Sequence, residues 1–250
     1  MIAVLKKAYY VTAYYLSWGF FFSVGFALNL FSLPLLLLPR RDSRGQWMRA
    51  VIRRLFELWV WWFNTSGVVR VRWHGFNEPL KPGTVFIANH PTLLDATFLL
   101  ARLPETICIF KPALMRNPAI GPPAIMAGYV AGEPGVDLVR EIAEKIAQNH
   151  SLLVFPEGTR TGPGLALGPI KPGFALIATR AHAPVQLIVI RASPDLVPRG
   201  RPWWRPPARQ PSIVDIILDR RWEYEPARSS TELTEEVEQH LLAVLRPPSA

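Results

Sequence analysis

Cysteine and histidine are scarce in this sequence, and their scarcity narrows the chemistry that the chain can carry. The 250 residues include one cysteine, Cys108, and five histidines. A single thiol excludes an intrachain disulfide and a multi-thiolate metal site. Cys108 stands between two isoleucines, which predicts a small buried strand residue rather than a nucleophile. The histidines show no metal-ligand spacing, so we expect neither a metal nor a bound cofactor.

Sequence signatures of several common protein classes are also missing. The chain has no Gly-x-Ser-x-Gly elbow, which argues against a serine esterase. It has no zinc-finger, helix-turn-helix or RNA-reading signature, although its formal net charge is +9. Half of its residues are apolar. A chain that is both basic and rich in apolar residues is expected to bind an anionic phospholipid surface, and we expect no nucleic-acid partner.

Residues 8–38 form a nearly uncharged apolar stretch between Lys6-Lys7 and Arg40-Arg41. A bilayer span needs about 20 apolar residues, so the stretch is long enough for one tilted crossing and too short for two. Polar residues and a proline in its later half leave a re-entrant helical hairpin open. A buried core helix is the plainer alternative, although such helices have only about 10–14 apolar residues. No signal-peptide cleavage pattern occurs.

Residues 46–64 mix arginines with tryptophans. This mixture is typical of the lipid headgroup zone, and an amphipathic helix packed on the following domain is the alternative. Six arginines between residues 40 and 54 favour the cytoplasmic side. We therefore expect membrane-anchoring and interfacial helices at residues 1–66 and an α/β domain at 67–250.

From residue 68 onward, short apolar runs alternate with helical stretches. Strands are predicted at 68–73, 84–88, 106–110, 152–155, 185–191 and 212–218, and helices at 92–102, 117–128, 136–149, 173–181 and 229–245. Ser229 and Glu232 have the spacing of a capping box at the start of the last helix. The alternation predicts a mixed, largely parallel sheet flanked by helices. The stretch 194–211, rich in proline and arginine, is expected to be a surface loop.

The block Asn89-His90-Pro91-Thr92-Leu93-Leu94-Asp95 follows a predicted strand. Histidine is the commonest general base, and Asp95 could fix its tautomer and stabilise the imidazolium. Two residues five apart on one helix point about 140° away from each other. The pair can therefore meet only if His90 lies just before a helix and Asp95 within it. Pro91 favours that arrangement, and a purely structural histidine is the alternative.

A second block, Phe155-Pro156-Glu157-Gly158-Thr159-Arg160, also follows an apolar strand. Ligands of parallel sheets bind at the carboxyl ends of the strands. Gly158 permits close approach of a ligand to the backbone, and the planar guanidinium of Arg160 suits a phosphate. A loop with a surface Arg–Glu pair is the alternative. Because both blocks end strands, we expect one shared site.

With these two blocks in order, the chain resembles the lysophospholipid (1-acylglycerol-3-phosphate) acyltransferase family, whose signatures are His-x4-Asp and Phe-Pro-Glu-Gly-Thr-Arg. The resemblance runs from about residue 68 to 195, and the N-terminal apolar segment matches the usual anchor. It implies direct transfer of a fatty acyl group from acyl-CoA or acyl carrier protein to an acceptor hydroxyl, without an acyl-enzyme. His90 would take the hydroxyl proton and Asp95 would hold His90.

The resemblance also implies partners and binding residues. The partners are an acyl donor, a lysophospholipid acceptor and membrane lipid, at the cytoplasmic face of the bacterial inner membrane. The expected substrate-binding residues are Asn89, Lys111, Glu157, Gly158, Thr159, Arg160 and Lys171. Lys111 is the expected additional phosphate contact, and a solvated surface lysine is its alternative.

One departure from the family pattern leaves the acceptor open. After the helix that follows Lys111, the family usually has a strand that ends in arginine, whereas residues 126–133 here contain none. The residues around His90 also resemble the branch of the family found with bacterial aryl-polyene biosynthesis. The acceptor is therefore either a lysophospholipid or a specialised lipid such as an aryl-polyene. Two alternatives belong to other functional classes. One is a hydrolase that uses His90 to activate water, and the other is a catalytically silent lipid-binding protein.

Overall fold

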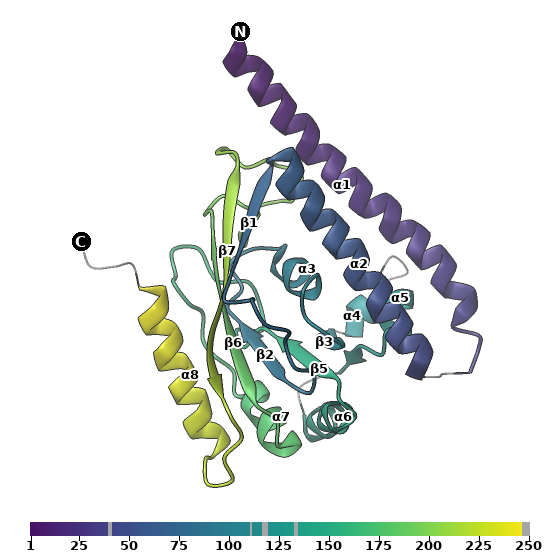
Figure 1. Cartoon of the computed structure of the whole chain (residues 1–250), viewed down its shortest axis with the longest axis vertical. Helices are drawn as coiled ribbons and strands as arrows, with labels where there is room; N and C mark the ends of the chain where they lie inside the picture. The colour runs from purple at the N-terminus through teal and green to yellow at the C-terminus, as the bar shows by residue number, and fades with distance from the viewer. Residues whose placement is uncertain (40–41, 111, 117–119, 133–134, 247–250) are drawn as a thin grey trace.

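The computed structural model describes residues 1–39, 42–110, 112–116, 120–132 and 135–246 (Figure 1). Its centre is a sheet with the strand order β1-β7-β6-β2-β5-β3-β4. The strands are β1 (Val69–His74), β2 (Val85–Ala88), β3 (Thr106–Phe110), β4 (Val130–Ala131), β5 (Ser151–Val154), β6 (Val185–Ala192) and β7 (Ser212–Trp222). Neighbouring strands are parallel except β6 and β7. The mixed, largely parallel sheet is confirmed.

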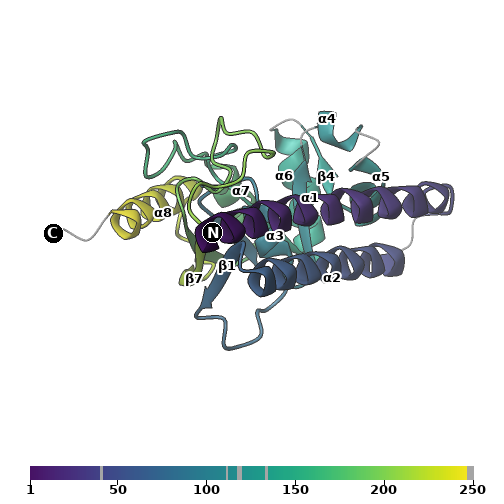
Figure 2. The same cartoon turned by 90° about the horizontal axis from the view of Figure 1, so that it is seen from above.

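Helices surround this sheet, and α1 and α2 run antiparallel along one flank while α8 lies beyond β7 on the other (Figures 1 and 2). They are α1 (Ile2–Leu35), α2 (Asp42–Ser66), α3 (Asp95–Leu100), α4 (Pro112–Met115), α5 (Gly121–Met126), α6 (Val136–Ala147), α7 (Gly173–Ala181) and α8 (Ser230–Leu245). The predicted capping box forms, because the Ser229 side chain accepts a hydrogen bond from the Glu232 N–H. Arg40, Arg41, Lys111 and residues 117–119 lie outside the described residues.

The core follows from strands that are covered on both faces. All four residues of β2 are buried, and the first six residues of β6 are buried as well. A strand covered on both faces has a continuous apolar sequence rather than an alternating one. This is why short apolar runs were sufficient to predict the central strands.

The α2 helix packs on the sheet domain, which was the alternative for residues 46–64. One face buries Met48, Trp59 and Phe63, and the helix contacts β1 and α3. The opposite face leaves Trp47 and Trp61 exposed. Its aromatic residues are therefore divided between the protein core and the outer surface.

The α1 helix is continuous from Ile2 to Leu35, so the helical hairpin left open as an alternative for residues 8–38 does not form. Polar groups in its interior bond within the helix: the Ser17 and Ser32 hydroxyls and the Asn29 amide each donate to the carbonyl four residues earlier. Pro34 falls in the last turn. The helix is long and apolar enough to anchor in a membrane. It is joined to α2 by the Trp59 indole, which donates to the Ser17 carbonyl at 3.0 Å.

The surface loop predicted at 194–211 is confirmed, and it also packs on α1. The Trp203 ring contacts Trp18 and Phe22, with ring centroids 5.0 and 4.9 Å apart. The Tyr14 hydroxyl donates to the Trp203 carbonyl. Earlier in the same loop, Val197 is fully buried. Aromatic contacts to a distant helix hold a segment whose local sequence is typical of a turn.

Candidate active site

The two sequence blocks follow β2 and β5 and lie at the same edge of the sheet. β2 and β5 are adjacent and parallel, with Ile87 opposite Val154. The His90 ring follows β2 and stacks on the Phe155 ring, which follows β5, with centroids 4.0 Å apart and planes 18° apart. The two blocks, both predicted to follow strands, therefore meet at one edge of the sheet, where the His90 and Phe155 rings are in contact.

His90 and Asp95 form a hydrogen-bonded pair. His90 Nδ1 lies 2.8 Å from Asp95 Oδ2, and the imidazole side chain is 17% exposed while the carboxylate is fully buried. This contact leaves Nε2 as the ring nitrogen available to a substrate. The predicted helix at 92–102 is shorter than expected, and α3 begins at Asp95 itself. His90 therefore lies ahead of the helix, and the carboxylate belongs to its first turn.

Thr92 holds the Asp95 carboxylate from the other side. The Thr92 N–H donates to Oδ2 at 2.7 Å and its hydroxyl donates to Oδ1 at 2.6 Å. Burial raises the pKa of Asp95, while the hydrogen bonds from His90 and Thr92 act in the opposite direction. The carboxylate is thus fixed on three sides before any substrate binds, which fixes the orientation of the imidazole as well.

Glu157 joins the two blocks through its carboxylate. Oε1 accepts from the His90 N–H and from the Thr161 hydroxyl, both at 2.9 Å, and Oε2 accepts from the Gly168 N–H at 2.7 Å. The side chain is only 4% exposed. Both oxygens are occupied by protein donors. The structure therefore places this expected substrate-binding residue beneath the site, where it holds the His90 backbone.

Asn89 has a comparable position at the end of β2. Its amide donates to the Ile190 carbonyl at 2.8 Å and accepts from the Ile190 N–H at 2.7 Å. These bonds continue the β2–β6 pairing beyond Ala88 through a side chain. The buried amide therefore fixes the direction in which the chain leaves the sheet at His90.

Arg160 lies against a loop that sequence reasoning did not assign to the site. Its Nη1 donates to the Val197 and Pro198 carbonyls at 3.2 and 3.0 Å. The Val197 carbonyl also accepts from the Leu93 N–H at 3.1 Å. Val197 has a positive φ of 45°. The adjacent proline, Pro198, was the only local sign of special backbone geometry, and nothing in the sequence pointed to these partners.

Gly158 and Lys171 bring a backbone turn and a cation together. Gly158 has a φ of +67°, and a Cβ built there would lie 2.9 Å from Lys171 Nζ. The Gly158 backbone thus lets the ammonium approach closely. Thr159 is exposed beside them. The carboxyl edge therefore carries an imidazole with a free nitrogen, a guanidinium and an ammonium, an arrangement suited to proton transfer next to an anion.

The comparisons with known proteins cover both blocks. A family model described as Acyltransferase matches residues 70–191. A 1-acyl-sn-glycerol-3-phosphate acyltransferase from Limnanthes alba is 32% identical over 124 residues, which are 46% of this chain and 43% of that protein. A protein of the same name from Helicobacter pylori (strain J99 / ATCC 700824) is 32% identical over 134 residues, which are 51% of this chain and 55% of that protein. The chain thus spans about half the length of these relatives.

A solved structure shares the fold over nearly the whole chain. It is the crystal structure of the 1-acyl-sn-glycerophosphate (LPA) acyltransferase PlsC from Thermotoga maritima, with a TM-score of 0.68. The match covers 96% of this chain and 95% of that chain at 21% identity. At this identity the likeness establishes the arrangement of helices and strands, including the long N-terminal helix.

Proposed function

We propose that the chain is an acyltransferase of the family whose model matches residues 70–191, and that it transfers a fatty acyl group from acyl-CoA or acyl carrier protein to a hydroxyl of a lysophospholipid such as 1-acylglycerol-3-phosphate. The observation that carries the proposal is the His90–Asp95 pair, held with Nε2 free at the strand edge. Relatives that bear the same name support the acceptor class.

His90 acts as the general base in this reaction. Nε2 takes the proton of the acceptor hydroxyl while that oxygen attacks the thioester carbonyl. The tetrahedral intermediate then collapses, the carbon–sulfur bond breaks, and the departing thiolate takes the proton back from the imidazolium. The products are an ester and a free thiol, and His90 returns to its starting state. The buried Asp95 carboxylate stabilises the imidazolium between the two proton transfers.

The acceptor phosphate binds beside the imidazole, at Arg160 and Lys171. Two Arg160 contacts use Nη1 alone, so the rest of the guanidinium remains available to phosphate oxygens. Gly158 keeps the backbone close to Lys171, and Thr159 adds a hydroxyl. Asn89 and Glu157 act as positioning residues for this site. Lys111, the other proposed phosphate contact, lies outside the described residues.

An acceptor other than lysophosphatidic acid is the second candidate, with the same mechanism. The supporting observation is the arginine missing from residues 126–133, where β4 carries only Val130 and Ala131. Loss of one phosphate ligand favours an aryl-polyene or other specialised lipid. Turnover with such lipids and none with lysophosphatidic acid would select this candidate.

The N-terminal helices place the enzyme at a membrane. We take residues 1–66 as the anchoring part and 67–250 as the catalytic domain, at the cytoplasmic face of the membrane, because of the arginines that follow α1. α1 exposes large apolar side chains, among them Phe26 at 71% and Leu30 at 62%. Side chains of this kind are expected to contact lipid.

The decisive experiment measures ester formation by the purified full chain in detergent, with lysophosphatidic acid and acyl-CoA or acyl carrier protein. His90→Ala is expected to lower kcat by roughly 10²–10⁴-fold, the usual contribution of a general base. His74→Gln is the control, because the His74 side chain is 50% exposed and bonds to Asp215. Undiminished transfer by His90→Ala would refute the assignment. Fatty acid release without acceptor, at the rate seen with it, would indicate a hydrolase.

A further inference from the structure

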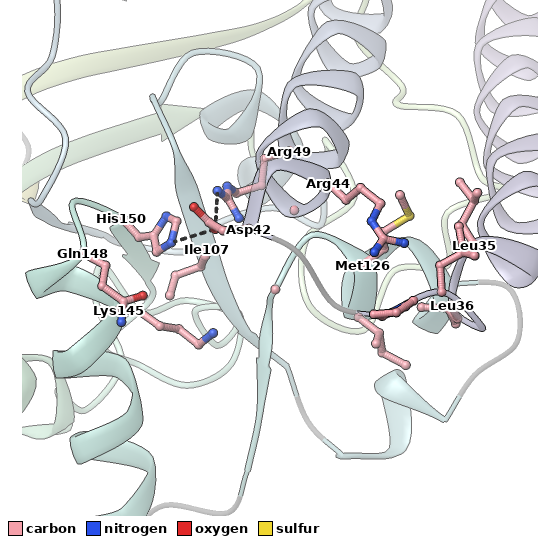
Figure 3. Close-up of a pocket in the computed structure, with 15 residues that line it drawn as sticks. Leu35, Leu36, Asp42, Arg44, Arg49, Ile107, Met126, Lys145, Gln148 and His150 are labelled. Atoms are coloured by element: carbon pink, nitrogen blue, oxygen red, sulfur yellow. Dashed lines mark ion pairs between the residues drawn. The ribbon is translucent and has the colours of Figure 1, made fainter.

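A pocket of about 450 Å³ lies among the ends of α1, α2, α5 and α6, and His90 is not among its lining residues (Figure 3). Its lining includes His150, which directly precedes β5. β2 and β5 run in parallel with Val85 opposite Leu152, so His150 is level with the residues before β2. His90 follows β2. At about 3.3 Å per strand residue, roughly 20 Å of sheet separates the pocket from His90. It is therefore a separate site at the amino edge of the sheet.

Cations dominate the polar lining of this pocket. Arg44, Arg49 and Lys145 line it together with one carboxylate, Asp42, which is 80% exposed. Arg49 is 6% exposed and is already held by Glu105 at 2.9 Å. Arg44 and Lys145 are half-buried, and neither has an ion-pair partner within the part of the chain that the structure describes. Half-buried cations without a carboxylate partner favour an anionic ligand.

The other side of the pocket is apolar and continuous with exposed leucines. Leu35, Leu36 and Leu38 line it, at the end of α1 (Figure 3). Next to them Leu37 is 88% exposed, and Trp47 at the start of α2 is 45% exposed. Leucines with a tryptophan beside cations are typical of a segment that enters the headgroup region of a membrane. The mouth of the pocket thus borders a surface suited to lipid.

We propose that this pocket binds the headgroup of an anionic membrane phospholipid, with its phosphate among the cations and the start of its acyl chains along the leucines. The volume lies within the range of small-molecule sites. The bound lipid holds the end of α1 and the start of α2 at the membrane surface. This site needs no catalytic residue, so the proposal stands or falls independently of the acyl-transfer chemistry.

Vesicle flotation of the full chain tests the proposal, with phosphatidylcholine vesicles that contain or lack phosphatidylglycerol. The test variant is Arg44→Gln/Lys145→Gln. The matched control is Arg54→Gln/Arg140→Gln, which removes the same charge from the same two helices at exposed residues paired with Glu57 and Asp137. Measurements in about 1 M salt, where the Debye length is about 3 Å, suppress diffuse attraction to the basic surface.

The test variant is expected to lose at least about tenfold in affinity for the phosphatidylglycerol vesicles, because two charge-assisted contacts to the lipid phosphate are lost, while the control binds as wild type. Arg44→Lys/Lys145→Arg should keep wild-type binding, which separates loss of charge from loss of folding. Equal behaviour of the test and control variants would overturn the proposal. So would competition by inorganic phosphate at constant ionic strength, because it would indicate a free-phosphate site.

Discussion

The Val197 carbonyl oxygen lies 3.2 Å from Arg160 Nη1, and it also accepts the Leu93 N–H at 3.1 Å. One backbone atom therefore contacts both sequence blocks of the site. Val197 is fully buried with a φ of 45°, a conformation that β-branched residues avoid. Such a conformation persists only where the surrounding structure enforces it, and it is often found at functional sites.

The first prediction concerns Trp203, six residues after Val197, whose ring contacts Trp18 and Phe22 of α1. Trp203→Ala removes these contacts and should loosen the loop that holds Arg160. We expect KM for the phosphate-bearing acceptor to rise about tenfold with a smaller change in kcat, the pattern of lost binding. Steady-state kinetics in detergent measure this, with Trp204→Ala as control because that side chain is 55% exposed. An unchanged KM would show that the loop and Arg160 are uncoupled.

Glu157→Gln provides the second prediction. The NH2 group that replaces one carboxylate oxygen cannot accept a hydrogen bond, so one of the donors, such as the Gly168 N–H, loses its partner. An unsatisfied buried donor costs about 1–3 kcal/mol, so the melting temperature should fall. The kcat should fall too, because the His90 N–H is held by the same carboxylate.

Thermal unfolding and kinetics on the same preparation separate the two roles considered for Glu157. A positioning residue affects stability and kcat together. If Glu157 instead contacts the acceptor directly, the variant should change KM while the melting temperature stays at the wild-type value.

The sheet and the shared site were predictable because they depend on local signals. Strands covered on both faces have continuous apolar runs, and parallel strands bring their following loops to one edge. Helix geometry gave the condition for the His90–Asp95 contact: residues five apart on one helix point away from each other, so His90 had to lie ahead of the helix. The helix begins at Asp95 and not at residue 92, and the Thr92 N–H donates to the Asp95 carboxylate.

The supporting contacts were not predictable, because they join residues that are far apart in sequence. Glu157 bonds to His90 across 67 positions, and Asn89 bonds to Ile190 across 101. The sequence of a motif does not show whether a side chain contacts the ligand or instead bonds to protein atoms beneath the site. The 194–211 loop was predicted, but its packing on α1 through Trp203 was not, because that contact also joins residues far apart in the sequence.

The third prediction is that the Cys108 thiol is inert in the folded protein. Burial raises its pKa to about 12, so almost no thiolate is present at pH 8. Iodoacetamide should leave Cys108 unmodified in the native protein and alkylate it after denaturation, as measured by intact mass. Rapid native alkylation would mean that β3 opens readily at this residue.

The last prediction concerns the pH dependence of stability at Asp95. Burial raises its pKa above the ordinary value of 3.8. Between 3.8 and the higher folded-state value, the folded protein binds more protons than the unfolded chain. The free energy of unfolding contributed by Asp95 therefore decreases as the pH rises through that window, and the penalty persists at neutral pH.

Asp95→Asn removes this titration and should make stability less dependent on pH in the same window. The stability advantage of the wild type over the variant should shrink as the pH rises, which urea unfolding at a series of pH values measures. The kcat should fall by about 10³–10⁴-fold, because His90 loses its anionic partner. If the wild-type advantage instead grows with pH, the hydrogen bonds from His90 and Thr92 outweigh burial, and the carboxylate is held ionised by its neighbours.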